Sequence, residues 1–325
     1  MQRTSWEYLI WAGFLLVCLV LGLGLGQWAA PQPVIGLVRF EGTIDLESAG
    51  PLIDLLEAAR KDRRVAAVVL ELASPGGLAT SSENIFYTLL KMRQEKPVVA
   101  VIDGIAVSGG YYVAAAANRI YAPASAYVGN IGTRGPRPPD PSLAPEELSS
   151  GPYKLTGGSR FDRIRQLELV KESFLGHVVH MRQNAELNPL QVAPEVLAEA
   201  RIYLGSEAVA IGLVDVEGSR SDAITGAAEL AGIRRYQVVE LESYLGGTAV
   251  PTPQPLDEAV QTLVETAPPD AVFLLDTRIP LPGVLEGTEV DQHLLRLRSM
   301  APLPTSHTLP RPPESSGVAP FPAGD

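Results

Sequence analysis

Three short, almost continuously apolar segments alternate with amphipathic ones near the start of the chain, and this alternation constrains the fold more than any other feature. The apolar segments cover residues 33–40, 65–72 and 97–102 and are rich in Val, Ile and Leu. Strands that are buried on both faces of a parallel sheet have this composition. Residues 46–60 and 82–93 carry apolar side chains at helical spacing, as crossover helices between parallel strands do. The sequence therefore predicts an α/β fold with a parallel sheet.

The same kinds of segment continue to about residue 241. Further helices are predicted over 161–184, 189–200, 206–211 and 221–231, with short extended segments at 202–204 and 213–216. We therefore expect a compact domain over residues 31–241, after an N-terminal segment over 1–30. A Pro-rich extension covers residues 242–325. Within it we expect a short amphipathic helix at 256–265 and a strand at 271–275, and otherwise extended, solvated chain.

The composition excludes several classes of function. The chain has 325 residues, of which 46% are apolar, so it can form a folded core. A net charge of −11 with only five lysines provides no basic surface for phosphates, so nucleic acid is not an expected partner. The single cysteine, Cys18, permits neither an intramolecular disulfide nor a zinc cluster. We expect no metal and no cofactor.

Residues 8–26 contain no charged side chain and are mostly apolar. As a helix, a segment of this length covers about 28 Å, close to the hydrocarbon thickness of a bilayer. The three tryptophans, Trp6, Trp11 and Trp28, lie near its ends, where aromatic rings meet lipid headgroups. A cleaved secretory signal is the alternative, but no pair of small residues marks a cleavage site after the apolar run. We therefore predict a single-pass anchor in the lipid of the cell membrane, with the folded domain outside the cytoplasm.

Two glycine-rich turns follow successive predicted strands. Ser74–Gly77 follows the second strand, and Ser108–Gly110 follows the third and precedes a helix-prone segment over 111–117. In an open α/β sheet, sites form beyond the carboxyl ends of strands, where helix N-termini direct free N–H groups. A serine at such a turn exposes its hydroxyl beside backbone N–H donors, and glycines allow a substrate to approach. Each turn alone could be an ordinary tight turn or a phosphate-binding loop, but the pair favours catalysis.

A serine nucleophile needs a base, and a lysine is the stronger candidate in this chain. The first histidine is His177, three residues before His180 in a predicted helix, where two partly exposed side chains are the simpler interpretation. Lys154 differs from the other lysines because it lies in an uncharged segment, residues 151–154. Burial there would lower the pKa of its amine, and a neutral amine can accept a proton from Ser108.

These motifs resemble those of a known family. The segments Lys96–Ala100, Val107–Tyr112 and Ala122–Gly132, preceded by Ser74–Gly77 and followed by Gly151–Lys154, are similar in kind and order to motifs of the signal peptide peptidase A family of serine–lysine peptidases. The resemblance covers about residues 34–233. It implies a fold of the Clp protease and crotonase type, with repeated β-β-α and β-α-β units. It also implies a membrane-anchored serine endopeptidase.

The resemblance further implies roles for individual residues. Ser108 is the expected nucleophile, and Lys154 is the expected general base of a Ser–Lys dyad. Asn130 stands where the family typically has a serine that bonds to the lysine amine, and its amide oxygen can take that orienting role. Ala73 replaces the asparagine that usually precedes the first turn. The backbone N–H groups expected in the oxyanion hole are those of Gly76, Gly77 and Gly109.

Single-copy members of the family assemble into rings, so the resemblance implies a homo-oligomer in which Lys154 reaches the Ser108 of a neighbouring subunit. The expected substrates are peptides, above all apolar remnants of signal peptides. A stomatin-operon-type peptidase that cleaves the tail of a membrane protein is a close alternative. A crotonase acting on acyl-CoA and a catalytically silent membrane scaffold are the alternatives from other classes. A Clp-type Ser–His–Asp protease is disfavoured because no histidine lies between Ser108 and His177.

Overall fold

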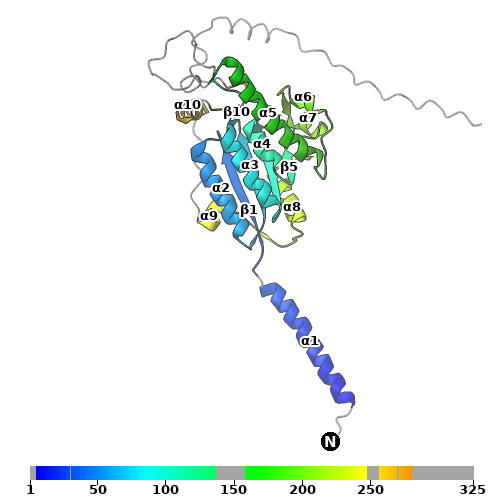
Figure 1. The fold of residues 1–325 in the computed structure, drawn as a ribbon. Helices are drawn as coiled ribbons and strands as arrows, with labels where there is room; N and C mark the ends of the chain where they lie inside the picture. The colour runs from blue at the N-terminus through cyan, green and yellow to red at the C-terminus, as the bar shows by residue number, and fades with distance from the viewer. Residues whose placement is uncertain (1–4, 30, 137–157, 247–255, 269–270, 280–325) are drawn as a thin grey trace, which may run out of the picture. The chain divides into compact units, whose positions relative to one another are not determined.

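The structure is a computed structural model that describes residues 5–29, 31–136, 158–246, 256–268 and 271–279 (Figure 1). Its described helices are α1 (Ser5–Ala29), α2 (Leu46–Lys61), α3 (Ala79–Arg93), α4 (Gly109–Ala115), α5 (Arg160–Gln183), α6 (Pro194–Leu197), α7 (Gly205–Ala210), α8 (Arg220–Leu230), α9 (Leu241–Leu245) and α10 (Leu256–Thr266). Its described strands are β1 (Val34–Glu41), β2 (Val65–Ser74), β3 (Gly76–Leu78), β4 (Val98–Val107), β5 (Arg119–Ala122), β6 (Tyr127–Gly129), β7 (Ile202–Leu204), β8 (Val216–Glu217), β9 (Gln237–Glu240) and β10 (Phe273–Leu275).

The main sheet has eight strands and is mostly parallel, as the sequence predicts. Its strand order is β7-β6-β4-β2-β1-β9, and β5 pairs with both β4 and β8. β2 pairs in parallel with β1 on one side and β4 on the other, whereas β6 and β7 are antiparallel. Ser74 at the end of β2 pairs with Ala106 near the end of β4. The two glycine-rich turns therefore start from neighbouring strand ends.

Helices cover both faces of this sheet. The larger apolar core lies between one face and α2, α3, α4 and α5, and includes Leu56, Phe86 and Phe174. Figure 1 shows α2 and α3 side by side over the strands. The smaller core lies between the other face and α8. Leu70 belongs to the larger core and Val69 to the smaller one, so β2 is buried on both faces, as its unbroken apolar sequence predicts.

The prediction of a helix over 189–200 is wrong over most of its length. α6 covers only Pro194–Leu197 and begins with Pro194 in its first turn. Proline is favoured at a helix start because an N–H group in the first turn has no partner within the helix, so its absence there costs nothing. The preceding backbone bonds elsewhere: the N–H of Gln191 donates to the carbonyl oxygen of Ile211 at 2.9 Å. This segment is therefore a loop against the end of α7.

Several short strands differ from the sequence prediction. The extended segment expected at 213–216 is reduced to β8, because the N–H groups of Leu213 and Val214 both donate to the carbonyl oxygen of Ala208. β3, β5, β6 and β9 were not predicted. Each has three or four residues, too few for the apolar period of a strand to stand out.

The N-terminal segment forms one helix, α1, over Ser5–Ala29. Its described side chains, Trp6 and those of residues 11–22, are exposed. Where side chains are described, no helix combines the length and the apolar character needed to cross a membrane. The structure thus gives no support to the predicted single-pass anchor, which stays a prediction.

Two elements beyond residue 241 pack against the compact domain. α10 corresponds to the predicted amphipathic helix and β10 to the predicted strand. β10 pairs antiparallel with β3 to form a second, two-stranded sheet. The small apolar cluster around this sheet includes Leu78, Val260, Leu263, Phe273 and Leu275. The predicted domain boundaries stay a prediction, and the proline-rich segments at 251–253, 280–282 and 302–325 lie outside the described residues.

Candidate active site

Ser108 lies between β4 and α4 in a strained backbone conformation. Its φ is 54° and its ψ is −122°, a region that residues other than glycine rarely adopt. The N–H of Ser108 donates to the carbonyl oxygen of Gly129 in β6 at 2.8 Å, which fixes the turn from the neighbouring strand. A sharp strand-to-helix turn of this kind presents the nucleophilic serine in many hydrolases.

The Ser108 side chain is buried and uncommitted. The residue is 1% exposed, and its Oγ has no hydrogen-bond partner among the described residues. A buried hydroxyl without a partner costs ~1–3 kcal/mol because it loses its bonds to water. Such groups are rare in folded proteins and point to a partner or reactant that completes the site.

Glycines allow the two turns to meet. A Cβ on Gly76, whose φ is +96°, would lie 1.9 Å from the carbonyl oxygen of Leu274 and 2.8 Å from the backbone nitrogen of Gly109. A Cβ on Gly110 would lie 2.6 Å from the carbonyl oxygen of Ser74. Both contacts are with backbone atoms, which cannot move aside, so only glycine fits. The end of β2 and the start of α4 are consequently in direct contact.

The Ser74 side chain supports the first turn. Its Oγ donates to the carbonyl oxygen of Gly42 at 2.7 Å and accepts the N–H of Gly76 at 3.2 Å. This support does not depend on position 73, where Ala73 replaces the asparagine usual in the resembled family. The N–H of Gly76 is engaged by Ser74, and Gly77 pairs with Leu274 in the β3–β10 ladder.

Asn130 follows β6, the strand in which the Gly129 carbonyl oxygen accepts the N–H of Ser108. It is 2% exposed and has a φ of +56°, a conformation that asparagine tolerates better than most residues. Its backbone N–H donates to Arg201, and its side-chain Nδ2 donates to the carbonyl oxygen of Ala200, both at 2.7 Å. The donor bond from Nδ2 fixes the orientation of the planar amide, so the amide oxygen faces away from Ala200.

The structure thus brings together Ser108, Gly76, Gly77 and Gly109. Asn130 directly follows Gly129, whose carbonyl oxygen accepts the N–H of Ser108. Lys154 lies outside the described residues. Its assignment as general base therefore stays a prediction, and so do the roles of the other site residues.

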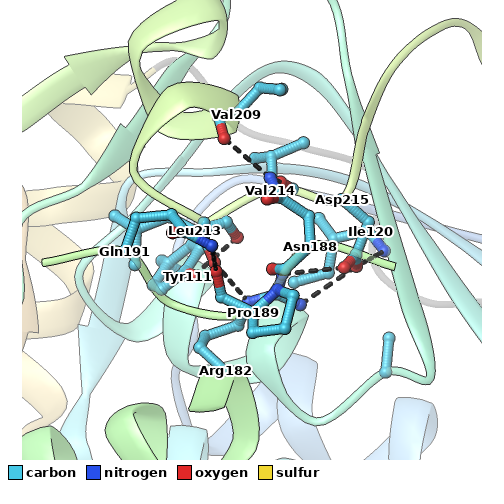
Figure 2. A network of polar contacts seen from close by, with 12 residues as sticks. Tyr111, Ile120, Arg182, Asn188, Pro189, Gln191, Val209, Leu213, Val214 and Asp215 are labelled. Atoms are coloured by element: carbon cyan, nitrogen blue, oxygen red, sulfur yellow. Dashed lines mark hydrogen bonds and ion pairs between the residues drawn. The ribbon is translucent and has the colours of Figure 1, made fainter. Parts of the chain in front are cut away.

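A buried polar network joins α4 to α5 and to the segment before β8 (Figure 2). Arg182 Nη1 and Nη2 donate to the Asp215 carboxylate at 3.0 and 2.8 Å, and the Tyr111 hydroxyl donates to the carbonyl oxygen of Leu213 at 2.7 Å. Burial acts to lower the pKa of Arg182, but the hydrogen bonds to Asp215 and the other electrostatic interactions of the guanidinium together raise that pKa, so Arg182 stays charged. Burial raises the pKa of Tyr111, which stays a neutral donor. The network fixes α4 at Tyr111, three residues after Ser108.

His177 is held in an aromatic cluster. Its Nδ1 lies 2.5 Å from the Tyr112 hydroxyl oxygen, and its ring stacks on Phe86 with centroids 5.1 Å apart. Burial raises the pKa of Tyr112 strongly, so the tyrosine is protonated and donates to the histidine. These contacts give His177 a packing role, and its side chain is half-buried, in line with the partly exposed side chain that the sequence predicts.

Sequence reasoning missed two residues near the turns, Leu274 and Arg134. The apolar run at 271–275 predicts a strand, but nothing in it identifies β3 as the partner. Arg134 pairs with Phe273 on the other side of β10, and its guanidinium donates to the carbonyl oxygens of Asp276 and Ile279 at 3.0 and 2.8 Å. These contacts link segments far apart in the sequence, which single-segment patterns do not reveal.

The mostly parallel sheet and the strained serine at a strand end define an α/β protein with a hydrolase-like turn. Residues 91–136, which include Ser108, Gly109 and Asn130, match the family model of peptidase family S49. This match, with relatives named SPPA and protease 4, confirms the predicted resemblance to the signal peptide peptidase A family.

Three of the curated relatives carry protease names. The chain is 28% identical over 199 residues to a putative protease of Methanocaldococcus jannaschii, an alignment that covers 58% of this chain and 63% of the relative. It is 30% identical to the chloroplastic serine protease SPPA of Arabidopsis thaliana, over 59% of this chain and 30% of that protein. It is 31% identical to protease 4 of Salmonella typhi, over 55% of this chain and 31% of the relative. The alignments therefore span less than two thirds of each relative.

Proposed function

We propose that the protein is a serine endopeptidase in which Ser108 is the nucleophile and Lys154 the general base. The observation that carries the proposal is the Ser108 turn: a buried hydroxyl without a partner among the described residues, on a strained backbone, beside a second glycine-rich turn. The family match and the protease names of the relatives support the same class of reaction.

The proposed reaction uses each residue for one task. Ser108 Oγ attacks the scissile carbonyl carbon while the neutral Lys154 amine accepts its proton. The N–H groups of Gly77 and Gly109 donate to the oxyanion, with Gly76 contributing mainly the shape of the turn. Lys154 then returns the proton to the leaving amine, and water releases the acyl group from Ser108. The amide oxygen of Asn130 accepts a hydrogen bond from the lysine amine and orients it.

Other functions of this fold fit the site less well. A crotonase-type enzyme for acyl-CoA would also use paired N–H donors, but it does not require a serine in a strained turn. A silent membrane scaffold would keep the fold without needing the energetic cost of an unpartnered Ser108 hydroxyl. The backbone edges of β3 and Arg134 pair with β10, so the region beside the turn accommodates an extended chain, the form in which a peptide binds by adding a strand.

The proposed function is tested by peptide cleavage with two matched variants. Ser108→Ala is expected to lower turnover by about 10⁶, as removal of a serine nucleophile does. Ser81→Ala removes a serine hydroxyl that is also buried, but lies in α3, and is expected to keep activity near that of the parent. Cleavage by Ser108→Ala at the parent's rate would rule out the assignment.

Finer features of the proposal rest on the family resemblance. We propose a Clp protease and crotonase type of fold, apolar signal peptide remnants as substrates, and attachment to the membrane through α1, with a stomatin-operon-type substrate as the alternative. Comparing cleavage of a free apolar peptide with cleavage of an intact membrane protein separates these substrates. Recovery of the chain in the membrane fraction after alkaline carbonate washing is expected from an anchored protein, and its release contradicts the anchor.

We also propose a homo-oligomer in which Lys154 serves a neighbouring subunit. Mixing Ser108→Ala and Lys154→Ala subunits then restores part of the activity, because some sites combine an intact serine with an intact lysine. Failure of this mixture in a demonstrated oligomer would show that the base acts within one chain.

A further inference from the structure

β10 lies between two backbone edges close to the Ser108 turn. Along β3 the register pairs Phe273 with Leu78, Leu274 with Gly77 and Leu275 with Gly76. On the opposite side, the N–H of Phe273 donates to the carbonyl oxygen of Arg134 at 2.8 Å, and the N–H of Arg134 donates back at 2.9 Å. β10 is therefore held on both sides, by β3 and by the isolated bridge to Arg134.

The carbonyl group of Leu274 lies where the two glycine-rich turns meet. Its oxygen would be 1.9 Å from a Cβ on Gly76 and 3.0 Å from a Cβ on Gly109. The backbone nitrogen of Gly109 is within 2.8 Å of that same Gly76 Cβ position. A backbone carbonyl of β10 thus occupies the region beside the helix N-terminus where an oxyanion hole would hold the carbonyl of a peptide.

We propose that β10 is a built-in strap that occupies the strand position of a peptide substrate and must be displaced before a peptide binds. The proposal rests on the proposed peptidase function, because it assigns the position of β10 beside the Ser108 turn to a bound peptide. The Leu274 side chain is 1% exposed and packs in the larger core, so a peptide bound in place of β10 would have an apolar side chain at this position. The strap thereby also indicates a preference for apolar peptides.

The contacts of β10 suit a segment that can lift away without unfolding the main sheet. Phe273 and Leu275 pack in the small cluster with α10, and Leu274 is the residue of β10 that packs in the larger core. The pairing with β3 covers three residues, whereas β1 and β2 pair along their whole length. Local opening of a small, peripheral unit costs less free energy than global unfolding.

The strap can be tested by locking it with a disulfide in the full chain. Leu78 and Phe273 lie opposite each other in the ladder. On one side of this pair the Ala79 N–H donates to the Val272 carbonyl oxygen, and on the other side Gly77 pairs with Leu274. Residues opposite each other in such a non-hydrogen-bonded pair have Cα atoms about 4.5 Å apart, within the range of a disulfide. The variant Leu78→Cys/Phe273→Cys, with Cys18→Ser to remove the other thiol, forms the lock.

The measurement is binding of a fluorescent peptide that copies residues 271–279, in a Ser108→Ala background so that the peptide is not consumed. The reduced protein is expected to bind the peptide, and the oxidised protein is expected not to. Leu78→Cys/Cys18→Ser controls for the effect of oxidant, since a single thiol cannot form the lock within one chain. Equal binding in the oxidised and reduced states overturns the strap, and so does absence of binding in both.

Failure of the strap can be distinguished from failure of the proposed function. The double-cysteine chain with Ser108 present is assayed separately for peptide cleavage in the reduced and in the oxidised state. Peptide binding that depends on the redox state, without cleavage, supports the strap and contradicts the peptidase. Cleavage that is equal in both redox states supports the peptidase and contradicts the strap.

Discussion

The Ser108 turn and the β3–β10 sheet meet at the Leu274 carbonyl, but they are built differently. The turn lies at the end of a long parallel strand and is fixed by Gly129, by the contact of Gly110 with Ser74 and by the network under α4. The small sheet has three residue pairs and its own apolar cluster. We call the Ser108 turn, with the strand ends and the network that fix it, the rigid region. The difference suggests that the rigid region carries the chemistry, whereas the small sheet controls access to it.

After the loss expected for Ser108→Ala, the largest effect on peptide cleavage is expected from replacing Lys154 with arginine. Arginine keeps the positive charge but does not release its proton at accessible pH, so it cannot act as a base. Loss of a general base is expected to lower the cleavage rate by about 10²–10⁴. In the parent, kcat/KM should rise with pH as the lysine amine loses its proton, because only the neutral amine accepts the proton of Ser108.

The control for this experiment is Lys171→Arg. Lys171 lies on α5, where its ammonium pairs with Glu168 at 3.6 Å, and arginine can preserve that pair. Full activity of Lys154→Arg, with an unchanged pH profile, would exclude the lysine base and return attention to the histidines.

A second prediction concerns the stability of the rigid region. Asp215→Ala leaves Arg182 buried without its carboxylate and also removes the acceptor of the Ile120 N–H, which lies 2.7 Å from Asp215 Oδ2. Breaking a buried ion pair in this way typically costs ~3–5 kcal/mol in free energy of unfolding. The midpoint of denaturant unfolding measures this loss.

The double variant Arg182→Met/Asp215→Leu provides the matched comparison. It replaces both charges by apolar side chains and is expected to recover most of the stability, because no charge is left unpaired. A double variant as unstable as Asp215→Ala would mean that the hydrogen bonds of the network, rather than the unpaired charge, determine its stability.

The smallest effects are expected at two glycines. Gly110→Ala places a methyl group against the carbonyl oxygen of Ser74 and is expected to destabilise the fold by ~1–3 kcal/mol and to slow peptide cleavage. Gly50→Ala, in α2, meets no atom within 4 Å and is expected to stabilise the fold by ~0.5–1 kcal/mol. Thermal unfolding of the two variants measures the difference. Equal effects would show that the turns do not need their close contact.

Much of the rigid region could be predicted from the sequence, and little of the small sheet. The three long strands of the main sheet, β1, β2 and β4, are almost continuous apolar runs, and the glycines beside Ser108 and Ser74 identify the turns that follow two of them. The short apolar run of β10 predicts a strand, but a three-residue strand carries no information about its partner. The helix expected over 189–200 fails because tertiary hydrogen bonds of its backbone outweigh local propensity. Lys154 lies outside the described residues, and its catalytic role, like that of Ser108, stays a prediction.

The central claim is that Ser108 is a reactive nucleophile, and a fluorophosphonate probe tests it most directly. Such a probe forms a covalent bond to an activated serine oxygen. Peptide mapping by mass spectrometry is expected to find the adduct on Ser108 in the native chain and to find none in Ser108→Ala or after denaturation. An adduct on another serine, or labelling of native Ser108 no faster than that of the denatured chain, would contradict the account.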